Sequence, residues 1–312
     1  MVITVNLNPA MDKTITLNGL NVGSVNRVES LRYDIGGKGI NVSKVLKNFR
    51  VESICTGFLG GIWERSFVEE LNKRGISNKF ISIEGDTRTN TKIVDVLNNT
   101  HTDINEPGPE VDSKKMQKFI DEFKILCKKN DIVVLSGGVS PSIPKDIYYK
   151  LTIIAKEKGA IVVMDADGEL LMEGVKAKPH IIKPNNHELK KLLNIDDTNE
   201  NEIIGAGQYL LQQGIEKVMI SLGDKGAIYI TKNGIYKSNS LKVNVKSTVG
   251  AGDSMVSAMV YAHIKNYDDA DTLRFATACG AATVSLEGTE ACTLEQVNEL
   301  LNDVRIEKKE CL

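Results

Sequence analysis

The sequence predicts an α/β fold with a doubly wound, largely parallel sheet that has helices on both faces. Three observations predict it: short apolar runs rich in β-branched residues, segments with helical spacing, and an alternation of the two along 312 residues. The composition agrees, because 41% hydrophobic and 26% charged residues are ordinary for a globular protein. At this length we expect about two domains, or one large α/β domain with an insertion.

The strands are predicted where short apolar runs lie between turn residues. They are expected at 3–7, 53–58, 132–135, 161–164, 180–183 and 217–221. The helices are predicted where apolar residues recur every three or four positions. They are expected at 40–49, 64–74, 113–128, 144–158, 186–193, 200–213, 253–265, 269–286 and 293–303. In such a sheet, ligands bind at the carboxyl ends of the strands.

Two segments, 12–35 and 87–106, break this alternation because they have strand-like patterns without an intervening helix. In the second, Asn98 and Asn99 lie between two β-rich runs and predict a hairpin turn. We interpret the two segments as a small β-sheet lid inserted into a core of 1–11, 36–86 and 107–312. A small sheet leaves faces and edges uncovered. We therefore expect a homodimer formed through the lid, although its apolar residues could instead fold back onto their own core.

Charge and cysteine content exclude several classes of partner. A formal net charge of −2 gives no reason to expect nucleic acid or an anionic membrane. No apolar stretch approaches the roughly 20 residues that a membrane span needs, and the start of the chain lacks the pattern of a signal peptide. The five cysteines and four histidines do not cluster, so we expect free thiols, a cytoplasmic protein and no structural metal site.

The run Thr248-Val-Gly-Ala-Gly-Asp253-Ser-Met combines a glycine-rich turn with the start of a helix, and a strand-like run at 241–245 precedes it. Unpaired N–H groups and the helix dipole attract an anion to such a turn, and the glycines let the backbone approach it closely. Asp253 could be a helix cap. It could also be a carboxylate that stays ionised and accepts a proton from a hydroxyl. A cap needs no close backbone approach, so we favour the base and predict phosphoryl transfer.

Four motifs, by their order and spacing, resemble the ribokinase/PfkB family of carbohydrate kinases over nearly the whole chain. They are Asn8-Pro-Ala-Met-Asp12, Gly36-Gly-Lys38-Gly-Ile-Asn41, Lys183-Pro-Asn-Asn-His-Glu188, and Thr248 to Met255. The resemblance is greatest to members that phosphorylate D-fructose 1-phosphate, and next to those that act on tagatose 6-phosphate. It implies ATP as the phosphoryl donor, Mg²⁺ as the cofactor and a phosphoketose as the acceptor. An alternative of another class is a non-catalytic sugar-phosphate sensor on the same fold.

The resemblance also implies a role for each of a set of residues. The catalytic residues are expected to be Asp253, as the base, and Gly250, Ala251 and Gly252, through their N–H groups. The residues expected to bind the phosphosugar are Asp12, Arg27, Gly37, Lys38, Asn41 and Arg88. The residues expected to bind ATP are Lys183, Asn185, Ser221, Gly223, Gly226, Thr248, Gly250 and Gly252. Glu188 is expected to bind Mg²⁺ through water.

Simpler interpretations stay open for several of these residues. Asp12 could form a turn, because aspartate favours such positions. Asn185 and Glu188 could merely begin a helix with an acidic first turn. Arg27 and Arg88 could be solvated surface charges, although arginine is also a bidentate ligand of phosphate.

Overall fold

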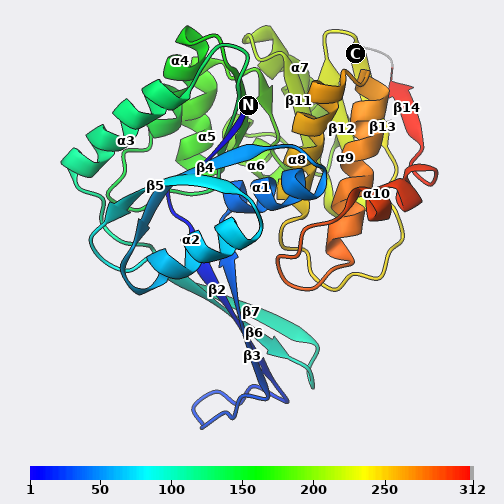
Figure 1. The fold of residues 1–312 in the computed structure, drawn as a ribbon. Coiled ribbons are helices and arrows are strands. Elements are labelled where there is room, and N and C mark those ends of the chain that lie inside the picture. Colours follow the sequence, from blue (N-terminus) through cyan, green and yellow to red (C-terminus); the bar gives the residue numbers. More distant parts are fainter. Residues whose placement is uncertain (310–312) are drawn as a thin grey trace.

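Two sheets make up the structure, a computed structural model that describes residues 1–309. The large sheet has ten strands in the order β14-β13-β12-β11-β10-β9-β8-β1-β4-β5, and the small sheet has four in the order β3-β2-β6-β7. Figure 1 shows the small sheet projecting from the body that the large sheet and its helices form. The predicted α/β fold with a separate small sheet is confirmed.

The large sheet is parallel from β5 to β11 and antiparallel from β11 to β14. Its strands are β1 (Val2–Asn6), β4 (Ser53–Gly60), β5 (Ser77–Ile83), β8 (Ile132–Ser136), β9 (Ile161–Asp165), β10 (Ile181–Ile182), β11 (Lys217–Ser221), β12 (Ala227–Thr231), β13 (Gly234–Ser238) and β14 (Ile306–Lys309). Because β1, β8 and β9 are neighbours, the segments that follow them meet at one edge of the sheet.

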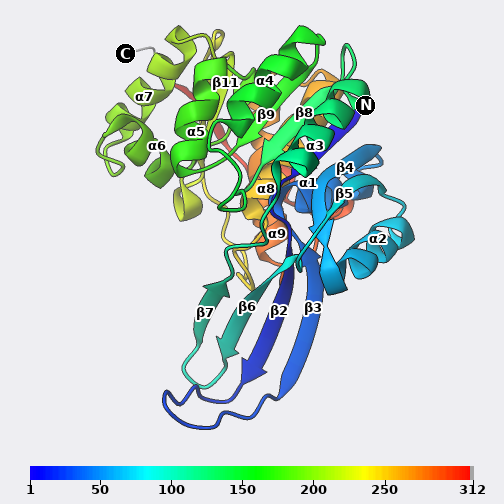
Figure 2. The same ribbon diagram turned by 90° about the vertical axis from the view of Figure 1, so that its left-hand side faces the viewer.

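Helices cover both faces of the large sheet. The α-helices are α1 (Lys38–Asn48), α2 (Glu64–Lys73), α3 (Ser113–Leu126), α4 (Ile147–Glu157), α5 (Gly168–Gly174), α6 (Asn186–Leu193), α7 (Glu200–Gln212), α8 (Ala251–Lys265), α9 (Asp269–Val284) and α10 (Leu294–Leu301). Short 3₁₀ helices lie at Gly61–Trp63 (η1), Val175–Ala177 (η2) and Gly223–Lys225 (η3). One apolar core joins α3 to α7 with strand residues such as Val133, and a second joins α1, α8, α9 and α10 with their neighbours, such as Val134. Figure 2 shows α3 to α7 together on one side.

The small sheet contains β2 (Ala10–Leu17), β3 (Ser30–Gly36), β6 (Arg88–Asp95) and β7 (Thr100–Asn105). The predicted hairpin is present, because β6 pairs with β7 in antiparallel fashion and Asn99 has the positive φ of 50° that such a turn needs. The sheet begins at Ala10, so Asp12 lies within one of its strands rather than at the end of a core strand. The division of the chain into a core and a lid domain stays a prediction.

One predicted strand is wrong. The run 241–245 alternates in sequence but pairs with no strand in the described part of the chain, and Val245 is exposed. The next strand of the large sheet after β13 is β14, which comes from the end of the described chain. Alternation alone therefore did not predict the pairing correctly, because β14, a distant segment, pairs with the edge of β13. The sequence analysis also did not predict β5, β12, β13 and β14.

Candidate active site

The predicted anion-binding turn forms the start of α8, two residues earlier than expected. Gly250 precedes the helix with a φ of 83°, a conformation that favours glycine, and Ala251, Gly252 and Asp253 form the first turn. No side chain within residues 1–309 caps this helix start, so the first-turn N–H groups point out of the helix without a capping acceptor there. Thr248 lies exposed just before the turn. The arrangement is suited to an anion.

Asp253 is buried, with 5% of its surface exposed. Its Oδ2 accepts a hydrogen bond from Asn41 Nδ2 at 2.8 Å, so its side chain does not cap the helix, and that interpretation is wrong. Burial, helped by the nearby Asp165, raises the pKa of Asp253 to about 6 against the opposing effects of Lys38, Asn41 and Lys183. The carboxyl group therefore titrates closer to neutral pH than we expected, which suits a general base.

A second buried carboxylate, Asp165, lies at the carboxyl end of β9 between two lysines. Its oxygens are 3.5 Å from Lys38 Nζ and 3.4 Å from Lys183 Nζ. Burial by itself would raise the pKa of Asp165, but the two ammonium groups outweigh it and lower that pKa. A Cβ added at Gly252 would lie 3.2 Å from Lys183 Nζ, so this lysine reaches the first turn of α8. The sequence analysis missed Asp165, although an acidic residue directly after the apolar run 161–164 was a signal.

The start of α1 carries the second glycine-rich motif. Gly37 precedes the helix with a φ of 128°, and Asn6 Oδ1 accepts a hydrogen bond from Ile40 N at 2.8 Å. A Cβ at Gly39 would lie 2.7 Å from Asn6 Nδ2, so this glycine is needed for close packing on β1. Lys38, the first residue of the helix, keeps 37% of its side chain exposed beside Asp165. The carboxylate raises the pKa of Lys38, which keeps its charge.

Asp12 and Arg88 lie where the small sheet joins the large one. Asp12 Oδ1 accepts a hydrogen bond from Asn90 Nδ2 at 3.2 Å across the paired strands β2 and β6, so Asp12 is not a turn residue. Burial raises the pKa of Asp12. Arg88 donates from Nε to Asn8 O at 3.2 Å and from Nη1 to Glu106 O at 3.1 Å. The guanidinium is therefore bound to the backbone and is not a freely solvated surface charge.

Within one chain, Arg27 does not lie beside Asp12 and Arg88. It is exposed and lies in the loop between β2 and β3. Figure 2 shows this loop at the end of the small sheet that is remote from the large sheet. The expected convergence of Arg27 with Lys38 and Arg88 is therefore absent from the single chain.

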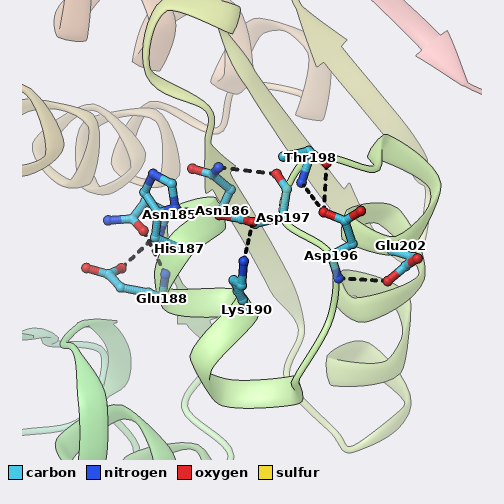
Figure 3. A network of polar contacts seen from close by, with 9 residues as sticks. All are labelled: Asn185, Asn186, His187, Glu188, Lys190, Asp196, Asp197, Thr198 and Glu202. Carbon is cyan, nitrogen blue, oxygen red and sulfur yellow. Dashed lines mark hydrogen bonds and ion pairs between the residues drawn. The ribbon is translucent and has the colours of Figure 1, made fainter.

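Asn185 and Glu188 form a reciprocal capping box at the start of α6 (Figure 3). Glu188 N donates to Asn185 Oδ1 at 2.8 Å, and Asn185 N donates to Glu188 Oε2 at 2.9 Å. Burial raises the pKa of Glu188, and the nearby Asp165 adds to the rise. These contacts are those of a helix start, as the simpler interpretation predicted. Any further role of the two side chains would use the atoms outside the capping box, such as Glu188 Oε1.

The start of α6 lies beside the end of β11, because Ser221 forms an isolated bridge with Asn185. The turn after β11 contains Gly223 and Gly226, with φ values of 61° and 89°. A Cβ at Gly226 would lie 2.3 Å from Ser238 O, so packing explains this glycine. A Cβ at Gly223 would meet open space, so only its backbone conformation calls for glycine.

Among residues 1–309, no helix has both the length and the apolar character of a membrane span. The site itself consists of two buried carboxylates, an uncapped helix start and two lysines at the carboxyl edge of the large sheet. Such an arrangement can accept a proton from a hydroxyl and attract an anion at the same place.

Comparisons with known proteins agree over nearly the whole chain. A model for pfkB family carbohydrate kinases matches residues 5–296. The 1-phosphofructokinase of Haemophilus influenzae is 38% identical over 310 residues, which are 98% of this chain and 97% of that protein. The tagatose-6-phosphate kinase of Staphylococcus epidermidis is 32% identical over 309 residues, which are 98% of this chain and 99% of that protein.

Among solved structures, phosphofructokinase-2 from Escherichia coli in complex with potassium has a TM-score of 0.92 at 23% identity, covering 97% of this chain and 98% of that one. This likeness shows a shared fold. The family model and the full-length relatives show, in addition, the family to which the chain belongs. The chain belongs to the pfkB family of carbohydrate kinases, which transfer a phosphoryl group to a sugar hydroxyl.

Proposed function

We propose that this protein transfers the γ-phosphoryl group of ATP to D-fructose 1-phosphate, giving D-fructose 1,6-bisphosphate and ADP. Full-length relatives of 34% to 38% identity that are named 1-phosphofructokinase support this acceptor. The nearest alternative is a tagatose-6-phosphate kinase, because relatives with that name reach 32% identity. The observation that carries the proposal is the buried Asp253 carboxylate in the first turn of an uncapped helix.

Asp253 is the proposed general base. Asn41 holds one of its oxygens, which leaves the other for the hydroxyl proton of the sugar. With a pKa of about 6, the carboxylate is ionised at neutral pH and close to the working range of a base. The hydroxyl oxygen attacks the γ-phosphorus in line, its proton passes to Asp253, and ADP leaves. The N–H groups of Gly250, Ala251 and Gly252 stabilise the charge on the transferred phosphoryl group.

The small sheet is the proposed sugar side of the site, and α6 and β11 are the proposed nucleotide side. Asp12 would accept hydrogen bonds from sugar hydroxyls, and Arg88 would use donors not bound to the backbone to contact the phosphate of the acceptor. On the nucleotide side we propose a set of residues that surrounds the phosphates of ATP: Lys183, Asn185, Ser221, Gly223, Gly226 and Thr248.

We further propose that Glu188 binds Mg²⁺ through water. The capping box uses Glu188 Oε2 and leaves Oε1 free, while the nearby Asp165 disfavours the charge on Glu188. A divalent cation would relieve that repulsion, and Mg²⁺ keeps several water ligands, so one carboxylate is a chemically reasonable site. When bound, Mg²⁺ neutralises charge on the nucleotide phosphates.

A homodimer through the small sheet is proposed from the register of its strands. Ile15 lies opposite Leu31 on β3 and Ile93 on β6, and these side chains share one face. Asp12 and its partner Asn90 belong to the other face, because they stand an odd number of positions away. Leu31 is 50% exposed. One face is thus left for a second copy while the other serves the sugar. We also propose a cytoplasmic location, which suits the free thiols of the described cysteines.

The test is a coupled ADP-release assay with fructose 1-phosphate, tagatose 6-phosphate, fructose 6-phosphate and fructose as acceptors. We expect the highest kcat/KM with fructose 1-phosphate. Highest activity with tagatose 6-phosphate would replace the acceptor and leave the kinase assignment intact. If the protein binds phosphosugars but releases no ADP from ATP with any of these acceptors, the result would favour the sensor and contradict catalysis.

A further inference from the structure

A buried lysine beside the site, Lys44, has no part in the chemistry described above. It lies on α1 close to Asn41, and only 5% of its surface is exposed. Its Nζ donates to the backbone carbonyl of Ile35 at 2.5 Å and to Asn41 Oδ1 at 3.5 Å. Because lysine is almost never buried unless its ammonium group is paired, these two contacts call for an explanation.

The charged groups that face Lys44 come from three elements around α1. They are Asp12 on β2, Asp34 on β3, and Glu70 and Arg74 at the end of α2. Burial, helped by the nearby Arg74, lowers the pKa of Lys44 to about 8 against the opposing effect of the three carboxylates. Lys44 is thus mostly protonated at neutral pH, and its hydrogen bonds go to a carbonyl and an amide oxygen.

Asn41 connects Lys44 to the base. Its amide has one end that only accepts and one that only donates. In the structure Oδ1 faces Lys44, and Nδ2 donates to Asp253 Oδ2 at 2.8 Å. If the amide turned over, Nδ2 would face an ammonium group that can only donate, and Oδ1 would face a carboxylate. Both contacts would become repulsive, so the charge on Lys44 favours a single orientation of Asn41.

We propose that Lys44 is a positioning residue for phosphoryl transfer, which acts by fixing the Asn41 amide so that it always donates to Asp253. This role rests on the proposed function of Asp253 as the base. The hydrogen bond from Asn41 holds one carboxylate oxygen and aims the other at the hydroxyl. A lysine one turn later on the same helix, Lys47, instead pairs at the surface with Glu52 at 3.0 Å and provides a matched control.

The first experiment compares Lys44→Met, Asn41→Ala, the double variant and Lys47→Met. In Lys44→Met we expect kcat to fall about tenfold to a hundredfold, as for a misplaced catalytic group, with the KM for ATP nearly unchanged. The acid limb of the kcat profile should move to higher pH, because Asp253 loses a hydrogen bond that lowers its pKa. The double variant should be no worse than Asn41→Ala, and Lys47→Met should match the wild type.

Additive losses in the double variant, or an unshifted acid limb in Lys44→Met, would overturn the proposal. If Lys44→Met does not fold, Lys44→Gln makes the same test, because its amide can still donate to Ile35 O but carries no charge. The second experiment needs no substrate: a ¹³C-aspartate NMR titration, with Asp253 assigned through Asp253→Asn. The pKa of Asp253 should rise in Asn41→Ala, and in Lys44→Met by the same amount or less, because there the Asn41 amide remains but is no longer fixed.

The two experiments separate this role from the choice of substrate. A rise in the Asp253 pKa without turnover of fructose 1-phosphate would reject the acceptor and keep the positioning role. Normal turnover of fructose 1-phosphate by folded Lys44→Met, with no change in that pKa, would keep the acceptor and reject the positioning role.

Discussion

The carboxyl edge of the large sheet buries charged residues, whereas the small sheet exposes apolar ones. At the edge of the large sheet, Asp165, Lys183 and Asp253 are only 1%, 4% and 5% exposed. On the small sheet and its hairpin, apolar Leu31 and Leu97 are 50% and 69% exposed. Buried charges and exposed apolar groups are the two informative exceptions to the rule that charged residues lie outside and apolar residues inside.

The two exceptions carry different information. A buried charge costs free energy unless it is paired, so a cluster of charges that persists inside a fold indicates chemistry. An exposed apolar surface costs the fold little but leaves area for a partner to cover. We therefore expect changes at the sheet edge to affect turnover, changes at the junction of the two sheets to affect sugar binding, and changes on the small sheet to affect assembly.

The largest expected effect is on turnover in Asp253→Asn. Removal of a general base usually loses about 10²–10⁴-fold in rate, and we expect at least the top of that range, because in the proposed mechanism Asp253 also orders the nucleophile. The fold and ATP binding should persist, since Asn41 can donate to the amide oxygen of the new side chain. Steady-state kinetics and calorimetry with ATP measure the two quantities. A variant that keeps more than a tenth of the wild-type kcat would contradict the assignment of the base.

Asp253→Asn should also raise the free energy of unfolding, by an amount that depends on pH. The pKa of Asp253 is about 6 in the folded chain, above its ordinary value of 3.8, so the folded state binds the proton more tightly. The wild type should therefore lose stability as pH rises from about 4 to about 6, and by about 3 kcal/mol at most. Urea denaturation should show Asp253→Asn more stable at pH 7.5, with the advantage fading toward pH 4. An equal advantage at both pH values would refute the buried-charge explanation.

At the junction, Arg88→Ala should raise the KM for fructose 1-phosphate and leave the KM for ATP nearly unchanged. A charge-assisted contact is worth about 1.5–3 kcal/mol, or roughly tenfold to a hundredfold in binding. Arg65→Ala is the control, because Arg65 is exposed and pairs with Glu69 along α2 at 2.6 Å. Equal effects of Arg88→Ala on both substrates would place Arg88 in a structural role.

The smallest expected effect on chemistry comes from Leu31→Asp, which places a charge within the exposed apolar face of the small sheet. Light scattering at low micromolar concentration should give a dimer mass for the wild type and a monomer mass for the variant. Ile125→Asp on α3 is the control, because Ile125 is 77% exposed and belongs to a helix that packs on the large sheet. Leu17 is unsuitable, since it is 4% exposed and its replacement would disturb the fold. A fully active wild-type monomer would show that the small sheet works without a partner.

Local pattern was enough for most of the fold and for one part of the site. Alternation of strand and helix predicted the large sheet, and the loss of helical spacing at 12–35 and 87–106 predicted the small one. The glycines of 248–255 predicted the glycine-rich turn that begins α8, although the predicted helix started two residues late, because backbone conformation depends on the residues at the turn itself. The sequence by itself determined these features.

Contacts between distant segments were decided only by the tertiary structure. Asn41 and Asp253 stand 212 positions apart, and no local spacing indicates that one donates to the other. Burial of Asp253 and its raised pKa likewise depend on what α1 and β9 bring beside it. The distance of Arg27 from the site follows from the length of the small sheet, and the absence of a strand at 241–245 follows from pairing by β14. Local residues set local geometry, whereas charge, burial and pairing depend on every segment that packs nearby.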